Sequence, residues 1–317
     1  MYDERMYLGI EIGGTKLQLG VGAGDGSPMV ELRRHDVDIA RGAAGILEQI
    51  ASTGRELVAK HGVKRVGFGF GGPIDATTGK VITSHQVRGW DDWPLAAWCQ
   101  ETLGRPAALG NDCDAAALAE ARFGAGRGAR TVFYITVGTG IGGGLAIDGR
   151  LHGAGRPAVA EIGHLRPGFA ATDSHDTIES RAAGPGIAAA ALALWRRDPL
   201  ADGTADLAAR AGGDFQNVTS KDVAAAAQDG NRFAIAVLDE ACRALGWAVA
   251  TVVTLISPEV VVIGGGVSLI GERHFFEPVR RHAAAYTFPP LAGAYRIVPA
   301  QLGEEVVVHG ALALAAS

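Results

Sequence analysis

The sequence predicts an α/β protein built of two similar halves, and three observations carry that prediction. A strand, a glycine-rich turn and a second strand are expected at residues 6–22, and the same pattern returns at 130–148. Apolar strands at 64–70 and 259–263 each run into consecutive glycines. Helical periodicity marks 232–256. A chain of 317 residues has room for two domains, and the repeated hairpin indicates an internal duplication.

The composition excludes several classes of partner. The formal net charge is −5 and no run of lysine and arginine is present, so neither nucleic acid nor an anionic membrane is expected as the main partner. The hydrophobic content of 48% suits a folded protein with a large core. Cys99, Cys113 and Cys242 are scattered and odd in number, which favours a reducing compartment over a disulfide framework.

The two apolar segments most open to misreading are the N-terminal strand and residues 247–263. Met1–Arg5 is polar and leads directly into a strand, so no signal peptide is expected and the protein is predicted to be cytoplasmic. Pro258 and Glu259 interrupt the apolar run at Trp247–Ile263. We therefore expect a buried helix followed by a strand there, and no membrane span.

The first chemically informative stretch is Leu109-Gly110-Asn111-Asp112, which leads into an alanine-rich helix. A carboxylate at Asp112 would sit at the positive end of that helix. A fixed carboxylate in a cleft can accept a proton from a substrate hydroxyl. The alternative, for this stretch alone, is that Asn111 or Asp112 is only a helix N-cap.

Two glycine turns of the first half are candidate contacts for a ligand. Gly13-Gly14-Thr15-Lys16 joins the expected strands Met6–Ile12 and Leu17–Gly22 and adds a hydroxyl and a cation to permissive glycines. An ordinary hairpin turn explains the same residues. Gly71-Gly72-Pro73 follows the strand Lys64–Phe70 and would place backbone over a cleft, or form a plain turn.

The second half repeats this organisation after a glycine-rich link at Gly124–Gly128. The strand Arg130–Val137 is followed by a turn at Gly138–Gly144 and a strand at Leu145–Asp148. Gly138 to Gly143 matches the pattern G-x-G-x-x-G of dinucleotide sites, but that pattern requires a helix after the glycines and here a strand follows. A dinucleotide site is therefore rejected.

Polar side chains and a third glycine turn complete the second half. Glu161 and His164 lie in a loop and together could bond neighbouring sugar hydroxyls, or belong to an ordinary surface loop. One helix is expected at Thr177–Trp195, with Glu179 near its start. Another helix is expected to begin at the N-cap Thr219. Gly264-Gly265-Gly266, between a strand and a helix expected at about Ser268–Ala285, is a place where a nucleotide could approach the backbone.

Six of these landmarks, in this order, resemble the ROK family of sugar kinases within the actin-like ATPase superfamily. The segments that carry the resemblance span nearly the whole chain and are Gly9-Ile10-Glu11-Ile12-Gly13-Gly14-Thr15-Lys16, Gly71-Gly72-Pro73, Gly110-Asn111-Asp112-Cys113-Asp114-Ala115-Ala116-Ala117, Val137-Gly138-Thr139-Gly140-Ile141-Gly142-Gly143-Gly144, Glu161-Ile162-Gly163-His164 and Pro258-Glu259-Val260-Val261-Val262-Ile263-Gly264-Gly265-Gly266-Val267.

The resemblance implies a two-domain actin-like, ribonuclease H-like fold with a central cleft. The domains would be 1–123 and 124–303, with a helix at about 304–317 packing back on the first. It also implies transfer of the γ-phosphoryl group of ATP to a hexose hydroxyl, usually the 6-hydroxyl, with Mg²⁺ bridging phosphate oxygens. The resemblance makes Asp112 the general base that accepts the hydroxyl proton. The expected sugar contacts are Gly72, Asn111, Asp112, Glu161, His164 and Glu179, and the expected nucleotide contacts are Gly13, Gly14, Thr15, Lys16, Gly138, Thr139, Gly140, Gly264, Gly265 and Gly266.

The sequence departs from the family pattern in three places. The usual aspartate of the first loop is Glu11, whose longer side chain is expected to reach Mg²⁺, directly or through water. Gln86 stands where an asparagine is common in the sugar loop. The family's zinc cysteines fall on Ala170, Thr172 and Thr177, so no zinc site is expected, although Asp173, His175 and Asp176 lie nearby.

Glucose is the expected substrate, and an N-acetylhexosamine (GlcNAc or ManNAc) is the runner-up. A sugar-responsive repressor of the same family would carry a helix-turn-helix domain, and a first strand near residue 6 leaves no room for one. A catalytically silent sugar-binding protein is the third alternative, against which Asp112 and the three glycine turns argue. A homodimer is the family's habit and is the expected assembly.

Overall fold

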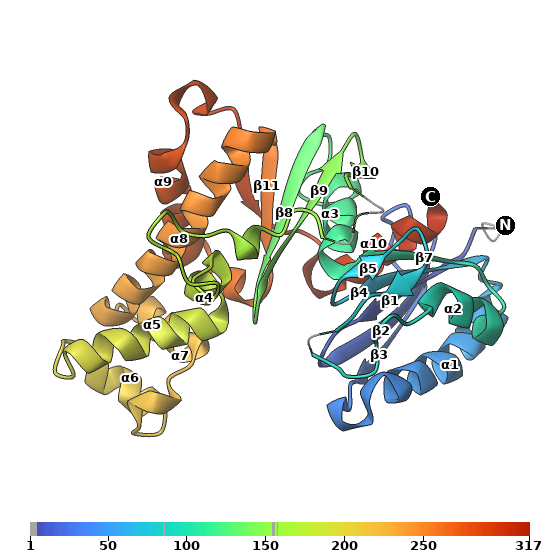
Figure 1. Ribbon diagram of the computed structural model, residues 1–317, viewed down its shortest axis with the longest axis horizontal. Coiled ribbons are helices and arrows are strands. Elements are labelled where there is room, and N and C mark those ends of the chain that lie inside the picture. The colour runs from blue at the N-terminus through green and yellow to red at the C-terminus, as the bar shows by residue number, and fades with distance from the viewer. Residues whose placement is uncertain (1–4, 85, 154–155, 157) are drawn as a thin grey trace. The chain divides into compact units, whose positions relative to one another are not determined.

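The structure is a computed structural model that describes residues 5–84, 86–153, 156 and 158–317 (Figure 1). Its contacts divide the chain into two compact units. Unit 1 comprises Met1–Tyr134, Gly144–Ala160 and Gln301–Ser317, and unit 2 comprises Ile135–Gly143 and Glu161–Ala300. The expected domains 1–123, 124–303 and 304–317 stay a prediction, and each unit is described by itself below.

Unit 1 is built on a five-stranded sheet of order β3-β2-β1-β4-β7. The hairpin β1–β2 and its neighbour β3 are antiparallel, whereas β1, β4 and β7 run parallel. The strands are β1 (Tyr7–Ile12), β2 (Lys16–Gly22), β3 (Glu31–Asp36), β4 (Arg65–Phe70) and β7 (Ala107–Asn111). A separate antiparallel pair is formed by β5 (Ile74–Asp75) and β6 (Lys80–Val81).

Two layers of helices cover this sheet (Figure 1). The helices α1 (Gly42–His61) and α2 (Leu95–Leu103) cover the face lined by Leu8 and Ile10, and α3 (Asp112–Arg122) and α10 (Val306–Ala316) cover the other. Glycine is required under α10, because a Cβ on Gly67 of β4 would lie 1.8 Å from the carbonyl oxygen of Ala311. The helix α3, which Asp112 begins, packs on α10 and on β4 and β7 of this sheet.

The second sheet has the order β10-β9-β8-β11-β12, the same order as the first when each set is counted along the chain. Its strands are β8 (Thr131–Val137), β9 (Ile141–Ile147), β10 (Arg150–Leu151), β11 (Val260–Gly264) and β12 (Arg296–Pro299). The expectation of two halves with one organisation is confirmed at the level of strand order.

The helices of unit 2 pack around the long helix α8. They are α4 (Ile178–Ala182), α5 (Gly184–Arg197), α6 (Thr204–Arg210), α7 (Ser220–Gln228), α8 (Arg232–Ile256) and α9 (Glu277–Tyr286). The prediction of a helix and then a strand at 247–263 is confirmed by α8 and β11. No helix in the described part of the chain combines the length and the apolarity that a membrane crossing needs.

Three expectations about these elements were wrong. The turn expected at Gly138–Gly144 is shorter, because β9 already begins at Ile141. The helix expected at Thr177–Trp195 is two helices, since Ala183 is extended (ψ 164°) just ahead of Gly184-Pro185, whose proline starts a new helix. The helix expected at Ser268–Ala285 is broken by Gly271 (φ +93°) into short turns followed by α9.

Candidate active site

Asp112 is the first residue of α3 and does not serve as the helix cap. Asn111, which ends β7, is the N-cap, because its Oδ1 accepts a hydrogen bond of 2.6 Å from the backbone N–H of Asp114. Asp112 Oδ1 accepts one from the backbone N–H of Cys113 at 2.8 Å. The capping alternative therefore applies to Asn111, and the carboxylate of Asp112 remains available for chemistry.

The surroundings of Asp112 make it a stronger base than an ordinary aspartate. Burial raises the pKa of the Asp112 carboxyl above its usual value, and the backbone hydrogen bond from Cys113 opposes part of that rise. A carboxylate with a raised pKa has a higher affinity for a proton at neutral pH. Desolvated carboxylates of this kind are typical of catalytic sites.

Two glycine loops of unit 1 meet beside Asp112. The backbone N–H of Gly71, just after β4, donates to the carbonyl oxygen of Ile12 at the end of β1 over 2.8 Å. A Cβ on Gly71 would lie 3.7 Å from Asp112 Oδ2 and 3.7 Å from the Cα of Gly13. Gly72 packs on the carbonyl oxygen of Thr83, which a Cβ there would approach to 2.9 Å. The predicted residues Gly13, Gly72 and Asp112 therefore lie around one point of unit 1.

The turn between β1 and β2 is a tight hairpin, as expected. The N–H of Gly13 donates to the carbonyl oxygen of Lys16 over 3.0 Å. A Cβ on Gly14 would lie 1.8 Å from Gln86 Oε1, so the Gln86 side chain rests on this turn. Thr15 joins the turn to the segment after β3, since its carbonyl oxygen accepts from the N–H of Val37 at 3.0 Å.

Glu11 is buried on β1 and bound by its neighbours. Its carboxylate lies 3.2 Å from Lys16 Nζ and accepts a 2.6 Å hydrogen bond from Gln18 Nε2. Burial raises the pKa of Glu11, Lys16 and Gln18 oppose that rise, and the negative charge of Asp112 adds to it. The carboxylates of Glu11 and Asp112 therefore interact electrostatically. The Glu11 carboxylate fits Mg²⁺, which binds one or two carboxylates together with substrate phosphates.

In unit 2 the predicted residues gather around Ile141, the first residue of β9. Glu179 Oε2 accepts a 2.7 Å hydrogen bond from the backbone N–H of Ile141. A Cβ on Gly163 would lie 2.0 Å from the carbonyl oxygen of Ile141, so the turn that carries Glu161 and His164 packs on the same residue. Both of those side chains are exposed. Glu179 and the turn that carries Glu161 and His164 therefore both contact Ile141.

The turn Gly138-Thr139-Gly140 and the turn Gly264-Gly265-Gly266 also come together in unit 2. Gly265 needs positive φ (+87°), and a Cβ there would lie 2.5 Å from the carbonyl oxygen of Val137. A Cβ on Gly138 would lie 4.0 Å from the backbone nitrogen of Gly266. The two glycine turns therefore face each other.

A cavity of about 310 Å³ opens between these turns. Its lining includes Gly138, Thr139, Gly266 and, from the first turn of α7, Ser220 and Lys221. The sequence argument missed Ser220 and Lys221, although the confirmed N-cap Thr219, with its capping box, was the signal that a helix begins there. Their hydroxyl and cation join the glycine backbone in a cavity that Ala224, Val267 and Ile270 also line. Backbone N–H groups, a hydroxyl and a cation are the donors that phosphates take.

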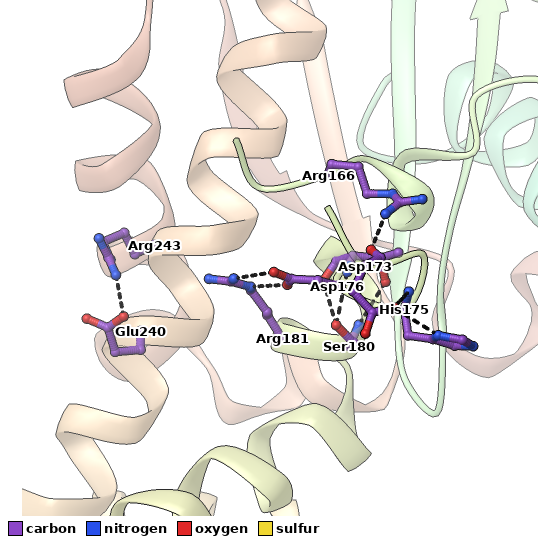
Figure 2. A network of polar contacts seen from close by, with 9 residues as sticks. Arg166, Asp173, His175, Asp176, Ser180, Arg181, Glu240 and Arg243 are labelled. Atoms are coloured by element: carbon purple, nitrogen blue, oxygen red, sulfur yellow. Dashed lines mark hydrogen bonds and ion pairs between the residues drawn. The ribbon is translucent and has the colours of Figure 1, made fainter. Parts of the chain in front are cut away.

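The segment in which no zinc site is expected, around Asp173, His175 and Asp176, carries hydrogen bonds and an ion pair. Among the residues that the structure describes, no three His, Cys, Asp or Glu side chains are grouped to hold a metal ion. Asp176 instead pairs with Arg181, and Asp173 accepts from His175 (Figure 2).

The two matching sheets and the helix-start carboxylate define an α/β protein of the actin-like ATPase fold. The sequence model of the ROK family matches residues 7–317, and the chain belongs to that family. A glucokinase of Thermotoga maritima is 31% identical over 312 residues, covering 97% of this chain and 96% of the relative, and one of Halalkalibacterium halodurans is 33% identical over 322 residues, covering 97% and 94%. The crystal structure of a ROK family glucokinase from Streptomyces griseus, in complex with glucose and AMPPNP, matches with a TM-score of 0.79 and 30% identity over 98% of this chain and 99% of that one.

Proposed function

We propose that this ATP-dependent sugar kinase of the ROK family transfers the γ-phosphoryl group of ATP to the 6-hydroxyl of glucose. The observation that carries the proposal is Asp112, a half-buried carboxylate that Asn111 frees from capping and that two glycine loops adjoin. The relatives named above, glucokinases at 31% and 33% identity, support glucose as the acceptor.

In this proposal Asp112 is the general base. The acceptor oxygen of the sugar attacks the γ-phosphorus, the bond from that phosphorus to the β–γ bridging oxygen breaks, and the hydroxyl proton passes to Asp112. The raised pKa of Asp112 favours that proton transfer. Because phosphoryl transfer needs positioning more than covalent chemistry, the remaining residues act by holding the two substrates.

The sugar is assigned to Gly72 and Asn111 in unit 1 and to Glu161, His164 and Glu179 in unit 2. The capping bond occupies Asn111 Oδ1 and not its amide nitrogen, which can donate to a sugar hydroxyl. Glu179 keeps a second carboxylate oxygen beyond the one that receives the Ile141 N–H. Carboxylate, amide and imidazole groups together match the donors and acceptors of neighbouring hydroxyls.

The nucleotide is assigned to the cavity between Gly138–Gly140 and Gly264–Gly266. The backbone of Gly138 and Thr139 and the side chain of Lys221 suit phosphate oxygens, and the Gly264–Gly266 turn suits the adenosine part. Gly13–Lys16 of unit 1 is assigned to the phosphates as well. Glu11 would hold Mg²⁺, directly or through water, and the ion would neutralise phosphate charge when it is bound.

We also propose a cytoplasmic homodimer, on the strength of the family resemblance alone. Light scattering after size-exclusion chromatography measures the assembly directly: a mass of twice 32.6 kDa supports the dimer and a mass of 32.6 kDa refutes it.

The proposed activity is tested by coupled ADP release over a panel of hexoses and amino sugars at equal concentrations. We expect glucose to give the highest kcat/KM, and mass spectrometry of the product to give glucose 6-phosphate. A higher kcat/KM for N-acetylglucosamine or N-acetylmannosamine would replace glucose by the runner-up. If none of the sugars on the panel led to ADP release, the assignment as a sugar kinase would be refuted.

A further inference from the structure

The segment from Leu165 to Thr177 joins two of the residues to which the sugar is assigned, His164 and Glu179. No α-helix or strand lies within it, and most of its side chains are exposed, Phe169 fully so. A connection of this kind is costly to order, because little apolar surface is buried in return. Something other than a hydrophobic core must therefore fix the two ends relative to each other.

Polar contacts within the segment supply that restraint (Figure 2). The Arg166 guanidinium donates to the carbonyl oxygen of Asp173, and Asp173 Oδ1 accepts from the backbone N–H of His175 at 2.8 Å. Asp176 and Arg181 form a two-pronged ion pair, with Nε to Oδ1 at 2.8 Å and Nη2 to Oδ2 at 2.9 Å. Parallel bonds between a guanidinium and a carboxylate fix direction as well as distance.

The positions of this ion pair relative to α4 are informative. Thr177 is the N-cap of α4 and forms a capping box with Ser180. Asp176 is therefore the residue before the cap and Arg181 is the fourth residue of the helix. In many helices these two positions carry apolar side chains that pack together as a hydrophobic staple and set the angle at which the chain joins the helix. Here the same two positions carry opposite charges.

The ion pair brackets a residue of the proposed site. Glu179 lies between Asp176 and Arg181 in sequence, on the first turn of α4, and holds the N–H of Ile141. The N–H of Ile178 donates to the carbonyl oxygen of Leu165 over 3.0 Å, which ties the residue after His164 to the same turn. A change in the angle at which the chain joins α4 would therefore move Glu179 and His164 together.

We propose that Asp176 and Arg181 form an ionic staple, a positioning pair that orders residues 165–177 on α4 and thereby sets Glu179 and His164 for the sugar. The role in sugar binding rests on the function proposed above. The hydrogen bonds from Arg181 lower the pKa of Asp176, so the pair is charged at neutral pH.

The test is a double-mutant cycle of Asp176→Leu, Arg181→Leu and the double variant. Each single change breaks the ion pair, whereas the double change restores a staple of the apolar kind. Glu48→Gln is the matched control, since it removes the charge of an exposed pair with Arg41 in unit 1, whereas the neighbouring Glu240–Arg243 pair on α8 (Figure 2) itself acts on the charge of Arg181. Hydrogen exchange of unliganded protein and steady-state kinetics are measured on all of them.

We expect each single variant to speed amide exchange in peptides covering 161–183 and nowhere else. We expect the KM for glucose to rise on the order of three- to tenfold, the scale of a partly exposed charge-assisted pair, with the KM for ATP and the melting temperature unchanged. The double variant should return the glucose KM to within about twofold of wild type, and the control should change neither quantity.

Three results would overturn the ionic staple: unchanged exchange in 161–183 in both single variants, a rise in the KM for ATP equal to that for glucose, or a double variant as impaired as the sum of the singles. The exchange measurement needs no substrate. A wild-type chain that phosphorylates no sugar would refute the proposed function and the positioning role with it, whereas the exchange data alone decide whether the pair orders the segment.

Discussion

Glu120 is a fully buried carboxylate, and replacing it by glutamine should lower the free energy of unfolding by weakening the contacts of the segment that re-enters unit 1. Its Oε1 accepts from the backbone N–H groups of Gln301 and Leu302, each at 2.9 Å, and its Oε2 accepts from that of Ala125 at 2.7 Å. Gln301 is the residue at which the chain re-enters unit 1 from unit 2. One side chain at the end of α3 thus secures two connecting segments.

The magnitude follows from these three bonds. Glutamine has one acceptor oxygen, so if that oxygen keeps Gln301 and Leu302, the N–H of Ala125 faces an amide NH₂ and is left unpaired at about 1–3 kcal/mol. Loss of the charge weakens the other two bonds by about 1 kcal/mol each. Burying a neutral amide costs less than burying a carboxylate, which offsets part of this. The net loss is about 2–4 kcal/mol, a large share of the usual stability of a folded chain, about 5–15 kcal/mol.

Urea unfolding followed by fluorescence and by circular dichroism measures the loss, and coincidence of the two curves tests whether two-state analysis applies. Glu56→Gln is the control, because that carboxylate is 61% exposed, and it should change the unfolding free energy by less than about 0.5 kcal/mol. A loss below about 1 kcal/mol for Glu120→Gln would refute the reasoning. Faster amide exchange at 301–305 would show where the loss arises.

Three further predictions concern the site. Gly266→Val should raise the KM for ATP on the order of tenfold and leave the melting temperature and the glucose KM unchanged. Nothing in the described structure lies within 4 Å of a Cβ at Gly266, so the new side chain would enter the cavity without a clash. Unchanged ATP kinetics would refute that nucleotide site. Asp112→Asn should raise the unfolding free energy at neutral pH. The folded-state pKa of Asp112 is raised, so the wild type loses stability as pH rises through that pKa, and the gain should vanish below the ordinary pKa of aspartate; equal stabilities at pH 7 would contradict the burial argument. Prolonged zinc chelation followed by restoration of Mg²⁺ should leave kcat and the melting temperature unchanged, and a loss that only zinc reverses would contradict the ordering by Asp176 and Arg181.

Local signals in the sequence were enough to predict the elements that carry the site. Two apolar segments joined by a glycine turn predicted β1 and β2, and N-cap residues predicted the start of α3 and of α7. The start of β9 was not predictable, because Ile141 is extended by tertiary contacts: Glu179 binds its N–H and Gly163 packs on its carbonyl. The residues next to Ile141 in sequence give no indication that Glu179 and Gly163 contact it.

The same limit explains which residues were missed. Glu120 was read only as part of an alanine-rich helix, and its partners Gln301 and Leu302 lie 181 and 182 residues away in sequence. Asp176 and Arg181 were missed as a pair. Asp176 was noted only as a residue near the lost zinc site, and Arg181 was not noted, because the N-cap at Thr177 that defines the staple positions was not predicted.

The central claim is that Asp112 is the base of a glucose kinase, and the Asp112→Asn variant tests it most directly. Glucose affinity by calorimetry and kcat by coupled ADP release are measured on one preparation of the variant and of the wild type. We predict a glucose Kd within about threefold of wild type and a kcat lower by roughly 100- to 10,000-fold, the usual effect of removing a general base. A variant that binds glucose normally and keeps a near-normal kcat would contradict the claim.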